Sequence, residues 1–158
     1  RSTKKDGDYQ HIKTIDSVGT SSWTDSSVKT GKTYYYKIKT VVKTQNGEQT
    51  SGFSNVKSAK AVPAKTTLKA KASDAKNVKL TWSKVKGASG YEIYRSNSKD
   101  GKYSKVKTIS KGSTTSYKNG KLKKSTTYYY KIRAYRKVNG KKVYGSYSSV
   151  ISVKTKAK

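Results

Sequence analysis

The six residues TYYYKI occur twice in this chain of 158 residues, at positions 33–38 and again at 127–132. The same offset of 94 positions aligns RSTKKDGDYQHIKTI (1–15) with RSNSKDGKYSKVKTI (95–109), and 9 of those 15 positions are identical. Self-similarity at one fixed offset is typical of a structural unit that is repeated along the chain. We therefore expect two related units.

The two copies differ in length. Residues 63–94 precede the second copy but have no counterpart before Arg1. The only proline, Pro63, stands at the junction, where it would end a preceding strand and open a linker. We therefore predict a partial domain at 1–62, without its N-terminal strands, and a complete domain at 63–158. We also expect the natural chain to continue upstream of Arg1, which would then be a cut or a break.

Alternation of apolar and polar residues, bounded by turn residues, predicts strands and no helix. In the complete copy the strands are expected at 66–72, 77–82, 90–95, 103–109, 115–118, 127–138 and 143–155. The composition agrees, because Thr, Val and the 14 Tyr are strand-forming residues. Short strands at this spacing predict an all-β, antiparallel, immunoglobulin-like sandwich. The partial copy is expected to supply strands four to seven of such a sandwich.

Composition and charge narrow the classes of function. Cysteine is absent, which rules out disulfides and thiolate chemistry. No apolar run approaches the roughly 18 residues that a membrane helix needs. The formal net charge is +29, and residues 63–158 carry +23 of it, from 26 Lys and Arg against 3 Asp and Glu. Such a field attracts polyanions, although lysines spread over strands also keep β proteins from aggregating.

The complete copy closely resembles a fibronectin type III domain. VKLTW places Trp82 at the end of the second strand, and GYEIYR resembles the third strand of that family. LKKSTTYYYKIRAY is similar to the family's sixth strand, with its leucine at Leu122 and its corner tyrosine at Tyr128. The resemblance covers residues 63–156 and, without the first three strands, residues 1–62. It implies fibronectin type III sandwiches in tandem, the first one incomplete.

The amino-acid sequence of the repeat also resembles modules of secreted, multidomain Gram-positive proteins. The segments concerned are YEIYRS, DGKY, VKTI and VNGKKVYGSYS. In such proteins these modules lie between catalytic and wall-binding domains. The resemblance implies a secreted or cell-surface location in a Gram-positive bacterium, with neighbouring domains of the same polypeptide as partners.

Each tyrosine triplet divides between the two faces of its strand, because neighbouring side chains point in opposite directions. The first and third rings are expected inside, where the first returns its hydroxyl to nearby backbone as a tyrosine corner. The middle rings, Tyr35 and Tyr129, are expected outside. The predicted core residues are Trp23, Tyr34, Tyr36, Ile38, Trp82, Tyr91, Ile93, Leu122, Tyr128, Tyr130 and Ile132.

The sequence predicts no catalytic or metal site and no cofactor. The single histidine, His11, aligns with Lys105 at an outward position and has no partner set. The turn KDGD loosely resembles a calcium loop but lacks the ligand series and the terminal Glu. An internal isopeptide bond would need a buried acid, whereas alternation directs Glu92 outward. We therefore predict that the chain is not an enzyme.

The outer face of the sheet with strands three, four and six is predicted to combine rings and cations. Rings can stack on sugars or bases, and cations can hold phosphate or carboxylate. The same surface can instead be a solvated face that resists aggregation. The residues of this candidate polyanion- or glycan-binding face are Tyr94, Lys105, Lys107, Tyr129, Lys131, Arg133 and Tyr135.

Three functions remain open at this level. The first is a non-catalytic extracellular spacer or adhesion module that contacts an acidic cell-wall polymer or glycan, with nucleic acid bound only non-specifically. The second is an accessory module of a cell-wall or polysaccharide-degrading enzyme whose catalytic domain lies outside this chain. The third is a fibre subunit in which another chain donates the strands that complete residues 1–62.

Overall fold

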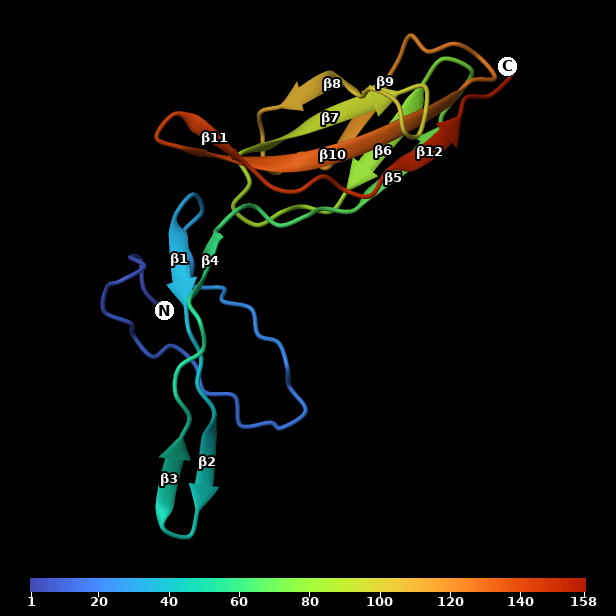
Figure 1. Ribbon diagram of the computed structural model, residues 1–158. Coiled ribbons are helices and arrows are strands. Elements are labelled where there is room, and N and C mark those ends of the chain that lie inside the picture. The colour runs from blue at the N-terminus through green and yellow to red at the C-terminus, as the bar shows by residue number, and fades with distance from the viewer. The chain divides into compact units, whose positions relative to one another are not determined.

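The computed structural model describes residues 1–158, and every regular element in it is a strand (Figure 1). Internal packing divides the chain into two compact units, Arg1–Ala61 and Val62–Lys158. This division falls one residue before the boundary that the sequence predicts. The all-β fold class is confirmed.

The unit Val62–Lys158 folds into two antiparallel sheets. Its strands are β5 (Leu68–Ala72), β6 (Val78–Trp82), β7 (Gly90–Ser96), β8 (Ser104–Ile109), β9 (Ser116–Asn119), β10 (Thr127–Val138), β11 (Lys141–Tyr144) and β12 (Ile151–Lys154). One sheet has the order β5-β6-β9, and the other has the order β11-β10-β7-β8, with β12 also paired to β10. Inward residues of both sheets form a single core, as in a sandwich.

Alternation along the strands creates this core. In β10, every second residue from Tyr128 to Ala134 is buried, and the residues between them are half-buried. The Trp82 ring on β6 packs against the Tyr91 ring on the facing sheet, with centroids 5.4 Å apart. The predicted core residues of the complete copy all lie in this cluster: Trp82, Tyr91, Ile93, Leu122, Tyr128, Tyr130 and Ile132.

The first tyrosine of each triplet forms the same local structure in both units. The hydroxyl of Tyr128 accepts a hydrogen bond from the backbone N–H of Lys123, 2.9 Å away. The hydroxyl of Tyr34 accepts one from the backbone N–H of Lys29 at 3.0 Å. Both rings are buried. The predicted tyrosine corner is therefore confirmed in both copies.

The end of the chain differs from the prediction. The sequence predicts one strand over 143–155, but β11 ends at Tyr144 and β12 begins at Ile151. Between them the chain still follows β10, because the N–H of Ser148 donates to the Ile132 carbonyl at 2.7 Å. The regular ladder is interrupted here, since the Ser148 hydroxyl accepts the Ile132 N–H at 3.1 Å in place of a carbonyl.

The unit Arg1–Ala61 contains two separate pairs of strands. β1 (Thr33–Tyr36) pairs with β4 (Lys57–Lys60), and β2 (Val41–Thr44) pairs with β3 (Gly47–Thr50). The sequence predicts equivalents of four consecutive sandwich strands, but the first two, within residues 9–31, are not strands. In the complete copy they correspond to β8 and β9, which pair with β7 and β6. Residues 1–62 have no equivalent of β6 or β7, so these segments lack a ladder partner.

Two residues predicted to lie in the core of the partial copy are exposed. Trp23 is 44% and Ile38 is 74% exposed, whereas Ile132, which matches Ile38 in the repeat, is 0% exposed. Tyr34 is buried and Tyr36 is half-buried. The prediction for Trp23 and Ile38 is wrong for the same reason as the missing strands, because no facing sheet covers this unit.

Candidate binding face

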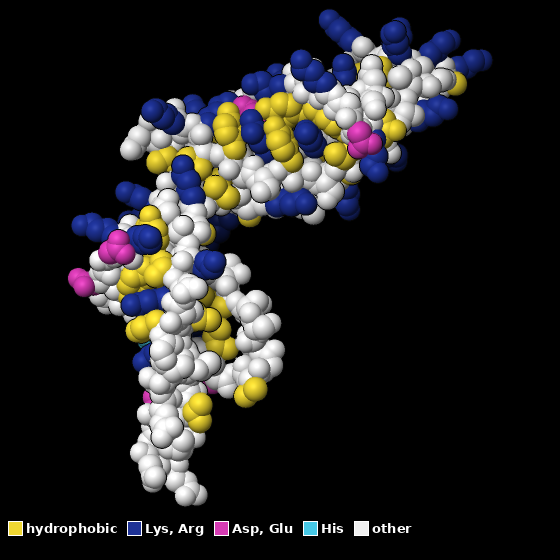
Figure 2. Space-filling view, viewed as in Figure 1, with side chains coloured by type: hydrophobic (Ala, Val, Ile, Leu, Met, Phe, Trp, Pro, Cys, Tyr) yellow, Lys and Arg dark blue, Asp and Glu magenta, His cyan; other side chains and the backbone are white.

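The outer face of the β11-β10-β7-β8 sheet brings rings and cations together. Antiparallel pairing places Arg133 of β10 opposite Glu92 of β7, and Lys131 opposite Tyr94. Directly paired residues share a face, so these side chains lie together on the side away from the core. Figure 2 shows hydrophobic and basic side chains interleaved over the region where Figure 1 places β7 and β10.

The carboxylate of Glu92 is at the centre of this face and is only 1% exposed. Arg133 Nη2 lies 2.9 Å from its Oε2, and Lys142 Nζ lies 3.0 Å from its Oε1. The hydroxyls of Tyr94 and Tyr144 donate to the same two oxygens at 2.8 and 3.1 Å. Burial raises the pKa of Glu92, but the bonds from Arg133, Lys142 and Tyr94 outweigh burial and lower the pKa to about 2. Glu92 therefore stays ionised at neutral pH.

Arg133 is held within the same cluster. Its guanidinium carbon lies 3.7 Å from the ring centroid of Tyr144 and 4.9 Å from that of Tyr147. Burial lowers the pKa of Arg133, but the hydrogen bond with Glu92 raises it, and the net shift is upward. The outward direction predicted for Glu92 is right, yet cations and rings cover its carboxylate. The charge of Arg133 is thus largely neutralised by Glu92 within the face.

Lys131 has no acidic partner. Its Nζ lies 4.3 Å from the ring centroid of Tyr103 and 4.5 Å from that of Tyr147, and it belongs to none of the ion pairs. The rings of Tyr147 and Tyr94 meet edge to face, with centroids 5.3 Å apart. A cation between two half-exposed rings can hold an anionic group while the rings cover flat apolar surface.

We call this surface the tyrosine face, and it consists of Tyr94, Tyr103, Tyr129, Lys131, Arg133, Tyr144 and Tyr147. The sequence pattern did not predict Tyr103, Tyr144 and Tyr147 as members of this face. The hairpin register could have found Tyr144, because it lies opposite Tyr135 in the ladder of β10 and β11. Tyr147 follows β11 in the irregular segment, where alternation predicts no direction. Lys105 borders the face, with its Nζ 3.7 Å from Glu92 Oε1.

Tyr135 and Lys107 do not belong to the exposed face that the sequence predicts. Tyr135 is 1% exposed, because its ring lies over Gly90, which has no side chain, and its hydroxyl donates to a backbone carbonyl of β8. A shift of register between β7 and β8 pairs Lys107 with the buried Ile93. Lys107 Nζ accordingly lies 6.0 Å from the Tyr117 ring of the other sheet.

The groups assembled on the tyrosine face are phenol rings, the ammonium group of Lys131 and the guanidinium of Arg133, which bind ligands by stacking and charge. No group of three or more His, Asp or Glu side chains that could hold a metal ion comes together in the chain. The only histidine, His11, is exposed, and its Nε2 lies 3.1 Å from the Thr14 hydroxyl.

No family model matches the sequence, and neither does any curated protein. Among solved structures, the sixth fibronectin type III domain from human fibronectin type III domain containing protein 3 matches over 63% of this chain and 92% of its own, at 17% identity and a TM-score of 0.52. The FN1–FN3 domains of chicken CNTN1 match over 85% of this chain and 46% of theirs, at 22% identity and a TM-score of 0.52. A Fn3-like protein from Clostridium thermocellum matches over 60% of this chain and 92% of its own, at 29% identity and a TM-score of 0.48.

The similarities with a TM-score of 0.50 or above show the fold. It is the antiparallel sandwich of fibronectin type III domains, as the sequence predicts, and the two facing sheets of the unit Val62–Lys158 form it. The structure has no helix that is long and apolar enough to cross a membrane.

Proposed function

We propose that this chain is a non-catalytic spacer and adhesion module of a larger secreted or cell-surface protein, and that its tyrosine face contacts an acidic cell-wall polymer or glycan. Fibronectin type III domains are commonly spacer or adhesion modules and are usually extracellular. The proposed location in a Gram-positive bacterium rests on the amino-acid sequence of the repeat, which resembles surface proteins of such bacteria.

The observation that carries the glycan part of the proposal is the position of Lys131. This cation lies between the rings of Tyr103 and Tyr147 and has no carboxylate partner. A uronic-acid glycan offers what such a site would bind, since each carboxylate is attached to a sugar ring with a flat apolar side. Charge and stacking would then act on the same residue of the polymer.

Titration of the full chain with hyaluronan, a uronic-acid glycan, tests this proposal. Replacing Tyr147 by Ala should weaken binding about fivefold, because it removes roughly 1 kcal/mol of ring contact. Tyr147→Phe keeps the ring and should bind as the natural chain does. Lys131→Gln should also weaken binding, and the exposed Lys84→Gln serves as its control. If the four variants bind equally, or if nothing binds at low salt, the tyrosine face is not a glycan site.

A second function, assembly by strand complementation, is favoured by the unit Arg1–Ala61. Ile38 is 74% exposed and Trp23 is 44% exposed, although the matching residues of the complete copy, Ile132 and Tyr117, lie in the core or pack against it. Strands supplied by another chain would cover these residues, as β5, β6 and β7 cover their counterparts. Light scattering should then show concentration-dependent oligomers that Ile38→Lys dissociates. A monomer at all concentrations would exclude assembly between copies of this chain.

A further inference from the structure

Three lysines lie side by side across the outer face of the β5-β6-β9 sheet. Lys71 of β5 is directly opposite Lys79 of β6, and Lys79 is directly opposite Lys118 of β9. All three are exposed, and none belongs to any of the four ion pairs. We call these residues the lysine row.

Such an arrangement opposes stability, because side chains at directly paired positions start only about 5 Å apart and like charges there repel. Lysines on edge strands are a common defence against aggregation, and this defence explains Lys71 on β5 and Lys118 on β9. It does not explain Lys79, which lies between them on the central strand β6. The middle lysine therefore calls for another cause.

Asp74, whose carboxylate is influenced by the charge of Lys118, is engaged in a turn of the chain. One oxygen of Asp74 accepts the N–H of Lys76 and the side-chain amide of Asn77, both at 2.8 Å. These bonds lower the pKa of Asp74, and the charge of Lys118 contributes a smaller part. Asp74 thus forms no ion pair with the lysine row.

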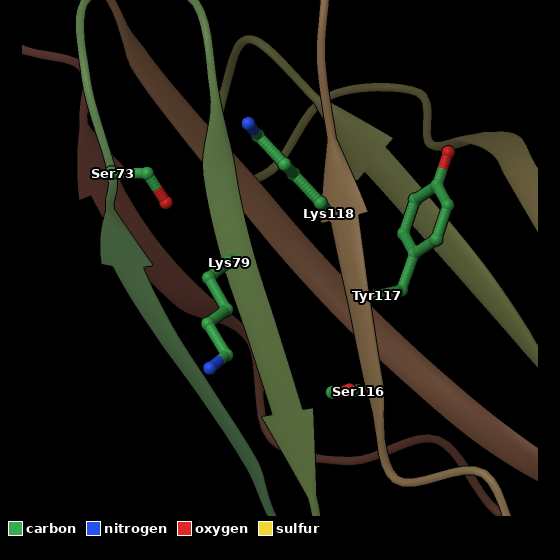
Figure 3. A pocket seen from close by; sticks show the side chains of 5 residues that line it. All are labelled: Ser73, Lys79, Ser116, Tyr117 and Lys118. Carbon is green, nitrogen blue, oxygen red and sulfur yellow. The ribbon is translucent and has the colours of Figure 1, made fainter.

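A hollow of about 260 Å³ opens beside the row and is lined by Ser73, Lys79, Ser116, Tyr117 and Lys118 (Figure 3). Figure 3 shows Lys79 and Lys118 on the neighbouring strands β6 and β9, whereas the Tyr117 ring lies on the other side of β9. Tyr117 packs against the core, so this face offers ammonium and hydroxyl groups but no exposed ring. The hollow therefore suits a charged and hydrated group rather than a sugar or a base that stacks.

We propose that the lysine row is a second binding site, separate from the tyrosine face, for the backbone of a linear phosphodiester or polyphosphate chain. Lysine ammonium groups bind phosphate as flexible point charges. Neighbouring strands are about 4.8 Å apart, so the row presents three cations in a line across the sheet to a ligand with closely spaced charges. The lysine row would recognise its ligand by charge alone, since it has no aromatic ring for stacking. This inference extends the proposed adhesion function, but it does not depend on the tyrosine face.

Binding of the full chain to long-chain inorganic polyphosphate over a series of salt concentrations tests the proposal. The test variant is K71Q/K79Q/K118Q. Its matched control, K84Q/K99Q/K124Q, removes the same charge from exposed lysines in loops and turns. The test variant should lose about tenfold in affinity at moderate salt, and its plot of log affinity against log salt should become shallower by about 2, because three ionic contacts are lost. The control should stay within about threefold of the natural chain.

Several results would overturn the proposal. Equal losses of affinity in the test and control variants would mean that polyphosphate binding depends only on the net positive charge of the chain. A comparable loss for Lys131→Gln alone would place the polymer on the tyrosine face. Much tighter binding of single-stranded DNA than of polyphosphate with the same number of phosphates would require contacts to bases, which the row does not offer. Thermal melting of both triple variants checks the fold, and the test variant is expected to melt no lower than the natural chain.

The two proposed sites can fail separately. If hyaluronan binding is unaffected by changes at Tyr147 while polyphosphate binding requires the lysine row, the glycan proposal is wrong and this inference stands. If hyaluronan binding depends on Tyr147 while polyphosphate binding does not depend on the lysine row, the lysine-row proposal is wrong and the glycan proposal stands.

Discussion

The two outer faces of the unit Val62–Lys158 are both basic, but they differ in where the balancing negative charge lies. On the tyrosine face, Glu92 lies within 3.0 Å of both Arg133 and Lys142, and rings cover the cluster. On the opposite sheet, Lys71, Lys79 and Lys118 face one another without any acid in ion-pair distance. The net charge of +29 therefore does not show which face binds a ligand. A cation that is paired within its own face stabilises the fold, and an unpaired one is available to a ligand.

Removing the internal anion should produce the largest effect. In Glu92→Gln, Arg133 and Lys142 lose their carboxylate, and the free energy of unfolding should fall by about 2–3 kcal/mol. This is less than for a fully buried pair, because both cations are partly exposed. Urea unfolding of the full chain, followed by tyrosine fluorescence, measures this fall. Asp100→Asn, in an exposed turn, is the control and should change little. A loss below about 0.5 kcal/mol would mean that the cluster behaves as an ordinary surface ion pair.

The same anion makes the stability of the tyrosine face depend on pH. The pKa of Glu92 is lowered from 4.5 to about 2 in the folded chain. A carboxylate whose pKa is lowered by folding stabilises the fold above its unfolded pKa, and this contribution is lost as the pH falls through the folded pKa. The gap in unfolding free energy between the natural chain and Glu92→Gln should therefore narrow below about pH 4.5 and nearly close near pH 2. A gap that stays constant over this range would show that ionisation of Glu92 is not its cause.

Removing a charge from the lysine row should raise the free energy of unfolding, by less than removing the charge of Glu92 lowers it. Replacing Lys79 by Gln removes the charge that is opposed from both sides, so the free energy of unfolding should rise by about 0.5 kcal/mol. Salt screens this repulsion, and the gain should shrink in 1 M NaCl. Lys84→Gln, on a loop without an opposed lysine, provides the comparison. If Lys79→Gln unfolds more easily than Lys84→Gln, the lysines of the row do not repel one another.

Local patterns predicted the parts of the fold that depend on a single strand. The repeated TYYYKI segments located both tyrosine corners, because the hydroxyl of Tyr34 or Tyr128 bonds to backbone only five residues away. Alternation also predicted the buried row of β10. It failed at Ile38, since burial of that residue needs a second sheet, which a strand pattern cannot supply.

The binding surfaces depend on pairing between strands, and here the sequence predicted less. Lys107 changes face through one shift of register, and Tyr135 is buried because Gly90 lies opposite it. Alternation directs Lys71, Lys79 and Lys118 outward, but only the register of three strands shows that they are directly opposed. For the same reason the sequence could not show that Glu92 neutralises the face on which it lies.

Nuclear magnetic resonance of the isotope-labelled full chain, titrated separately with polyphosphate and with hyaluronan, tests most directly whether unpaired cations determine where ligands bind. Polyphosphate should shift the amide signals of β5, β6 and β9 around the lysine row, and hyaluronan should shift those around Lys131 and Tyr147. With polyphosphate, the signals of Glu92 and Arg133 should move less than those of the lysine row. One common set of shifts for both polymers, or shifts spread evenly over all lysines, would contradict the account.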